Sequence, residues 1–163
     1  MQSVTNDIRV PVNRNGVRGY AIIDKSNKHL LDYSWFDCKG YVARDKHGTP
    51  ELMHRVIMNA KPGQSIDHID GNKRNNKVSN LRVCNHAQNN RNKPPSVKNK
   101  TGFKGVSFDT QTNKFRADIR FDGNRMNLGR YNTAKEAALA YNAAAVKYFG
   151  DFAWLNKIGE NNE

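Results

Sequence analysis

A short stretch in the middle of the chain, residues 66–90, holds most of the side chains that could do chemistry. Two carboxylates, two histidines and a run of asparagines lie within it. Such a density of hydrogen-bonding groups is poor material for a core, because each buried polar group needs a partner. The adjacent Asp67 and His68, together with Asn80 and Asn89, are therefore the first candidates for a functional site.

The pattern around these residues predicts two short strands followed by a helix. Residues 65–69 and 81–84 alternate polar and apolar side chains, as half-buried strands do. Residues 70–72, with the sequence Asp-Gly-Asn, are typical of a turn. Asn85 can cap a helix over roughly 86–92. The segment therefore reads as strand, loop, strand and helix.

This arrangement offers a metal ion two oxygen ligands. Asp67 falls at the end of the first strand, and Asn89 lies one turn into the helix. Carboxylate and amide oxygens suit a magnesium-like ion that keeps some of its waters. Neighbours in a strand point to opposite faces, so His68 need not share the metal with Asp67 unless the strand end is irregular.

The segment resembles the HNH nuclease motif of homing-type endonucleases, which has the ββα-metal fold. The resemblance rests on the Asp67-His68 pair, on Asn80 with the leucine after it, and on Asn89, nine residues after Asn80. It implies that His68 is the general base and that Asn80 holds the loop so that His68 is aimed. It also implies that Asp67 and Asn89 bind the metal. Because Asn89 stands where the terminal HNH histidine would be, magnesium or manganese is favoured over zinc. A polar hairpin with one structural histidine is the alternative.

The residues before this motif predict a β-rich lead-in. Short apolar runs separated by turns at residues 13–16, 39–40 and 47–48 indicate several strands. The block resembles the lead-in of many phage-type HNH proteins, and we interpret it as a scaffold that also approaches DNA. His54 lies at the start of an expected helical turn, where a structural hydrogen bond is favoured over a catalytic role.

The C-terminal third has a different pattern, which predicts three strands and a helix. The strands are expected at 105–108, 115–121 and 125–129. Residues 133–136, Thr-Ala-Lys-Glu, form a capping box, and the helix that follows should end near Phe149. Alternation places apolar side chains on one face of the middle strand and arginines on the other.

This third of the chain resembles the AP2 DNA-binding domain. The matching stretches cover nearly all of 101–156, including Leu-Gly-Arg-Tyr at 128–131 and Trp-Leu-Asn at 154–156. In that family the three-stranded sheet enters the major groove of DNA. Carried over position by position, the DNA contacts would be Lys104, Ser107, Arg116, Asp118, Arg120, Arg125 and Asn127. Ser107, Phe115 and Asn127 differ from the residues at these positions in the plant AP2 domains. These differences affect the expected target sequence and not the expected docking mode.

Composition agrees with a nucleic-acid partner. The 163 residues carry a net charge of +12, and each third of the chain has a basic excess, so a long contact surface is favoured over a basic tail. Two cysteines 46 positions apart form no zinc-knuckle pair. The chain starts with polar residues and has no long apolar stretch, so we expect a cytoplasmic protein with no membrane partner.

Together these features predict an α+β chain with the following domains. We expect an HNH nuclease domain with its lead-in at 1–93, a linker at 94–100, an AP2-like domain at 101–156 and a tail at 157–163. The expected function is metal-dependent hydrolysis of double-stranded DNA by a monomer or weak dimer. One site per chain predicts a nick per binding event. A DNA-binding regulator that no longer cuts is the alternative, while the paired aromatic motifs of RNA-binding domains are missing from the sequence.

Overall fold

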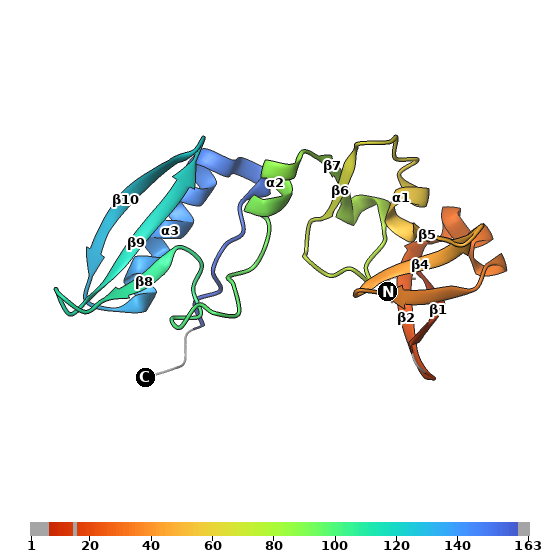
Figure 1. The fold of residues 1–163 in the computed structure, drawn as a ribbon, viewed down its shortest axis with the longest axis horizontal. Coiled ribbons are helices and arrows are strands. Elements are labelled where there is room, and N and C mark those ends of the chain that lie inside the picture. The colour runs from red at the N-terminus through yellow and green to blue at the C-terminus, as the bar shows by residue number, and fades with distance from the viewer. Residues whose placement is uncertain (1–6, 15, 160–163) are drawn as a thin grey trace, which may run out of the picture. The chain divides into compact units, whose positions relative to one another are not determined.

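The computed structural model describes residues 7–14 and 16–159, which form a mixed α+β chain of two compact units (Figure 1). The first unit ends at Asn89 and the second begins at Asn90, so the division falls inside a short helix. The tail expected at 157–163 lies partly outside the described residues. Across the described part of the chain, no helix is long and apolar enough to cross a membrane.

The first unit consists mainly of short strands. Its elements are β1 Asp7–Arg14, β2 Val17–Asp24, the 3-10 helix η1 Lys25–Asp32, β3 Trp35–Cys38, β4 Tyr41–Lys46, β5 Thr49–Leu52, α1 Met53–Ile57, β6 Ser65–His68, the 3-10 helix η2 Val78–Asn80, β7 Leu81–Cys84 and α2 His86–Arg91. The helix that follows Asp24 is of the 3-10 type. The strand pair and the helix expected within 65–92 are confirmed, and Asn85 caps α2 by accepting a hydrogen bond from the Gln88 amide at 2.8 Å.

The lead-in forms a five-stranded sheet in the order β2-β1-β3-β4-β5. β1 and β3 run parallel, and the other neighbours are antiparallel. Alternate residues of the strands pack inward with η1 and α1 around one apolar core. Its buried members are Val10, Val12, Ala21, Ile23, Leu30, Trp35, Val42 and Met53. The indole of Trp35 donates to the Leu30 carbonyl at 2.7 Å, so its polar atom is satisfied inside the core.

The loop between β6 and β7 is attached to the edge of this sheet. The Ile22 amide donates to the Arg74 carbonyl, and the Asn76 amide donates back to the Ile22 carbonyl, both at 2.8 Å. Further along the loop, the Val78 amide donates to a carboxylate oxygen of Asp24 at 2.7 Å. Three hydrogen bonds between the loop and β2, whose last residue is Asp24, therefore fix the backbone of the loop, although more than fifty residues separate the partners.

The second unit is a three-stranded antiparallel sheet with one long helix against it (Figure 1). Its elements are β8 Val106–Asp109, β9 Lys114–Phe121, β10 Asn124–Tyr131, α3 Ala134–Phe149 and the 3-10 helix η3 Gly150–Phe152. The capping box of α3 is confirmed, because Thr133 and Glu136 exchange side chain to backbone hydrogen bonds. The sheet order is β10-β9-β8, with β9 in the middle.

Small residues allow α3 to lie close to this sheet. Ala137, Ala138 and Ala145 of α3 are fully buried, as is Ala117 of β9. Gly105 has a φ of +76°, and a Cβ placed there would come within 2.0 Å of the Tyr141 ring. A side chain at position 105 would therefore both strain the backbone and push α3 away. The opposite face of the sheet remains exposed to carry polar side chains.

Candidate functional site

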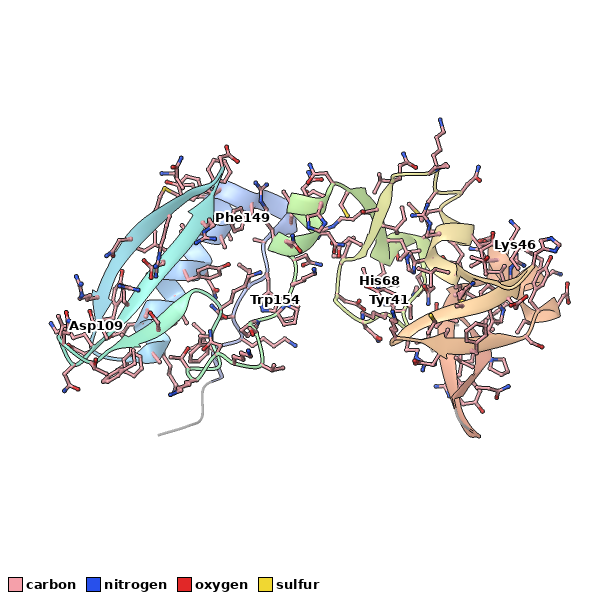
Figure 2. All side chains as sticks on the ribbon, in the orientation of Figure 1. Tyr41, Lys46, His68, Asp109, Phe149 and Trp154 are labelled. Atoms are coloured by element: carbon pink, nitrogen blue, oxygen red, sulfur yellow. The ribbon has the colours of Figure 1, made fainter. Side chains whose placement is uncertain are left out.

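His68 lies at the end of β6 (Figure 2). Only 4% of its surface is exposed, and its ring orientation is fixed by Asn76. Nε2 of His68 is 3.2 Å from Oδ1 of Asn76, whose side chain is completely buried. The Asn76 amide nitrogen donates to the Lys73 carbonyl at 3.3 Å, with Oδ1 turned toward His68. Oδ1 can only accept, so Nε2 of His68 carries the proton and the lone pair of the neutral ring is on Nδ1.

A group of rings keeps His68 in an environment that disfavours its charged form. The ring centroids of His54 and His68 are 5.0 Å apart, and that of Tyr41 lies 5.3 Å from His54 and 6.3 Å from His68. Burial lowers the pKa of His68, against the opposing effect of its hydrogen bond to Asn76. Burial also lowers the pKa of His54, to about 4. Both imidazoles are therefore neutral at physiological pH.

Asp67 is held by a cross-strand partner on the same face of the hairpin. Asp67 in β6 is directly opposite Arg82 in β7. Nε and Nη2 of Arg82 donate to Oδ2 of Asp67 at 3.0 and 2.7 Å. The Asp67 side chain is 8% exposed and the Arg82 side chain 15%, so this ion pair is largely shielded from water.

Asn80 ties the beginning of the loop to its end. Its Oδ1 accepts from the Asp70 amide at 3.0 Å, and its Nδ2 donates to the Asp70 carboxylate at 2.9 Å. Nδ2 also donates to the Asn75 carbonyl at 2.8 Å. The backbone carbonyl of Asn80 accepts from the amide of Ile69, the residue that follows His68. Asn80 thus connects three points of the loop next to His68.

The donor chemistry around Asp67 fits a hard divalent cation. Among the described residues, no group of three or more His, Cys, Asp or Glu side chains is placed to hold a metal. Asp67 supplies a carboxylate, and the half-buried Asn89 supplies an amide from α2, which follows β7 after one residue. An oxygen donor set of this kind suits a magnesium-like ion that retains waters.

In the second unit, the expected contact residues occupy the sheet face opposite α3, with one exception. Arg116 is directly across from Ser107 of β8, Asp118 from Asn127, and Arg120 from Arg125. One carboxylate oxygen of Asp118 accepts from Arg116 at 2.9 Å and from Arg125 at 2.7 Å. The face is therefore a set of arginines, two of which are held by one acid.

Lys104 is the exception, because its ammonium group is used inside the second unit. It donates to the carbonyls of Arg91 and Lys93, each at 2.6 Å, and to that of Asn90 at 3.4 Å. Burial lowers the pKa of Lys104 to about 8. Residues 91 and 92, which precede the linker expected at 94–100, are also packed here: the Arg91 guanidinium lies 5.0 Å from the Phe149 ring, and Asn92 is buried.

Comparison with known proteins identifies the motif-bearing segment. The family model for HNH endonucleases matches residues 51–91. The chain is 36% identical over 132 residues to the "Uncharacterized HNH endonuclease L560" of Acanthamoeba polyphaga mimivirus. The aligned region covers 77% of this chain and 68% of that protein. The chain belongs to the HNH endonuclease family. It is also 30% identical over 79 residues to "Protein 3.8" of Escherichia phage T7, covering 48% of this chain and 65% of that protein. No solved structure matches the chain.

Three contacts around His68 and Asp67 were not identified from the sequence. They are the Asn76 contact to His68, the Arg82 contact to Asp67 and the packing of Tyr41 beside both buried histidines. The strand alternation already placed Arg82 on a face of the hairpin, and knowledge of the register would have paired it with Asp67. For Asn76 there was no comparable signal, because it lies among other asparagines in a loop.

Proposed function

We propose that this chain is a metal-dependent endonuclease that hydrolyses phosphodiester bonds in double-stranded DNA, with His68 as the general base. The observation that carries the proposal is the buried His68 imidazole, which is held by Asn76 and follows the buried Asp67 in the sequence, within the segment that matches the HNH family. Nucleases of this family generally use divalent metal ions. The direct test is the cleavage of supercoiled plasmid in Mg²⁺, compared with EDTA.

The orientation of the Asn76 amide supports a specific atom as the base. With Nε2 of His68 donating to Asn76, Nδ1 has the lone pair that can take a proton from water. That water attacks the phosphorus, and the bond to the 3′ oxygen breaks. A well-placed general base contributes about 10²–10⁴ in rate. Asn80 acts as a positioning residue, because it fixes the backbone that follows His68.

Asp67 and Asn89 are the residues we assign to the metal, which is Mg²⁺ or Mn²⁺. When bound, the ion supplies positive charge for the phosphate and for the departing 3′ oxygen. The burial of Asp67 keeps this charge from being screened by bulk water. The hairpin of β6 and β7 with α2 is then the ββα-metal element of a homing-type nuclease domain, which we place at 1–93.

We further propose that the second unit is an AP2-like module, at 101–156, which binds the major groove through its exposed sheet face. Arg116, Arg120 and Arg125 present guanidinium groups there, and arginine forms paired hydrogen bonds with guanine edges. The family resemblance implies that Asp118 contacts DNA. Its ion pairs with Arg116 and Arg125 favour a different role, in which Asp118 holds these two arginines in place. Lys104 is better assigned to the internal contacts that it already makes.

Removing the Asn76 side chain should slow cleavage without weakening DNA binding. In Asn76→Ala protein, Nε2 of His68 loses its acceptor, and the ring is no longer confined to one tautomer and orientation. We expect the single-turnover rate to fall by about 10- to 100-fold, as when the partner of a functional imidazole is removed. Asn76→Asp is the matched variant, because it retains an acceptor for the Nε2 proton and should keep more activity.

The ¹⁵N chemical shifts of the His68 ring separate positioning from a purely structural role. They should report protonated Nε2 in the parent and in Asn76→Asp protein, and a tautomer mixture in Asn76→Ala protein. If all three proteins had the same tautomer and cut at the same rate, Asn76 would have no positioning role.

The arginine face should determine which DNA sequences are preferred. With cleavage prevented by EDTA, a selection from randomised duplexes gives a preferred site for the full chain. Arg116→Ala or Arg120→Ala should then lose about 1–3 kcal/mol on that site and much less on scrambled DNA, if the guanidinium reads a base edge. Arg9→Ala, an exposed arginine of β1, is the control for loss of one charge. An equal loss on every sequence would assign these arginines to phosphates instead.

A further inference from the structure

The ion pair between Asp67 and Arg82 places a positive charge beside the carboxylate of the proposed metal site. Arg82 already balances the one carboxylate assigned to the metal, through two hydrogen bonds to Oδ2. A dication arriving alone would therefore meet a guanidinium beside its main ligand.

Burial makes this positive neighbour important. Arg82 is mostly shielded from water, and two like charges at close range repel more strongly where the effective dielectric constant is low. A bound DNA phosphate changes the balance, because it contributes a negative charge next to the same ligands. Arginine also matches the geometry of a phosphate, to which it can donate two parallel hydrogen bonds. DNA can thus compete with Asp67 for the Arg82 guanidinium.

We propose that Arg82 couples metal binding to DNA binding. In the free protein its guanidinium pairs with Asp67 and weakens the metal site. On DNA the guanidinium pairs with a backbone phosphate, and the Asp67 carboxylate becomes a full ligand for the ion. This inference rests on the proposed function, in which Asp67 binds the metal. Since linkage is reciprocal, metal must then also strengthen DNA binding by the same factor. The device confines metal loading to protein that already holds its substrate.

The experiment measures Mn²⁺ affinity by electron paramagnetic resonance, in full-length protein carrying His68→Ala so that DNA is not cut. Affinity is determined with and without a short mixed-sequence duplex. With Arg82 present, we expect weak binding alone and binding tighter by about 5- to 150-fold on DNA, the usual range of a coupling between two sites. With Arg82→Gln added, Mn²⁺ should bind several-fold tighter to the free protein, and the duplex should increase this affinity much less than it does when Arg82 is present.

Two further variants make the outcome specific. Arg82→Lys keeps the positive charge but loses the planar fork, so its free-protein affinity should stay near that of the parent and its coupling should shrink. Arg44→Gln is the control, because Arg44 also pairs with an acid, Glu51, in the first unit, and is similarly shielded at 17% exposure. Arg44→Gln should change neither the Mn²⁺ affinity of the free protein nor the increase in that affinity on DNA.

The results separate this inference from the proposed function. If Asp67→Ala does not weaken Mn²⁺ binding on DNA, the proposed metal site is wrong. If binding depends on Asp67 but Arg82→Gln leaves the free-protein affinity unchanged or weaker, the coupling role of Arg82 is overturned and the metal site stands. Should Arg82→Gln not fold, an Arg82→Lys protein whose free affinity is several-fold tighter than the parent, or whose coupling is undiminished, would overturn the inference as well.

Discussion

Replacing His68 with alanine should abolish DNA cleavage and leave DNA affinity within a few-fold of the parent. In the proposed mechanism the imidazole takes its proton only as the water attacks, so its loss affects the transition state and not the docking of DNA. We expect the single-turnover rate in Mg²⁺ to fall by about 10²–10⁴-fold or more. Affinity is measured separately, by fluorescence anisotropy of a labelled duplex in EDTA.

The controls for this variant are two other histidines. His29→Ala removes an exposed histidine of η1 and should cut like the parent. His54→Ala removes the ring 5.0 Å from that of His68 and should lose less activity than His68→Ala. If His68→Ala still nicked DNA while His54→Ala did not, the base would have to be reassigned to His54.

The second large effect is expected for Asp67→Ala, which should lose metal-dependent cleavage and bind Mn²⁺ more weakly on DNA. The change removes the carboxylate ligand and also leaves the Arg82 guanidinium unpaired beside the site. Breaking a buried ion pair by removing one partner costs about 3–5 kcal/mol in the free energy of unfolding. Urea unfolding of the variant must therefore be measured together with its activity.

Two comparisons separate lost ligation from lost stability. Asp67→Asn keeps the size and an oxygen donor, and should be better folded yet still defective in Mn²⁺ binding. Asn89→Ala should show a smaller defect, because a neutral amide contributes less to a hard cation than a carboxylate does. Asp32→Ala, an exposed aspartate of η1, serves as the control. Normal metal binding and cutting by both Asp67→Ala and Asn89→Ala would remove them from the ligand set.

The elements whose formation depends on local sequence could be predicted well. The capping box at Thr133 and Glu136 defined the start of α3, and alternation over 115–121 defined β9 and its two faces. The hairpin and α2 were defined in the same way, since the turn at 70–72 and the Asn85 cap are local signals. In each case the deciding interactions join residues close together in the chain.

The contacts that depend on distant parts of the chain could not be predicted. The five-stranded sheet includes a parallel pairing of β1 with β3, which no periodicity specifies. The attachment of the loop between β6 and β7 to β2 joins Ile22 to Asn76, and the position of Asn76 against His68 follows from it. Lys104 was assigned to DNA by position along the chain, although the carbonyls that hold it come from residues 90–93.

The most direct test of the central claim is a cleavage assay on supercoiled plasmid with the purified full-length chain. In Mg²⁺ we predict conversion to the nicked circle first, because each chain has one proposed site, with linear DNA appearing only later. The same protein in EDTA, and the His68→Ala protein in Mg²⁺, should leave the plasmid supercoiled. A parent protein that binds the plasmid but never cuts it in Mg²⁺ or Mn²⁺, or that cuts equally well in EDTA or without His68, would contradict the account.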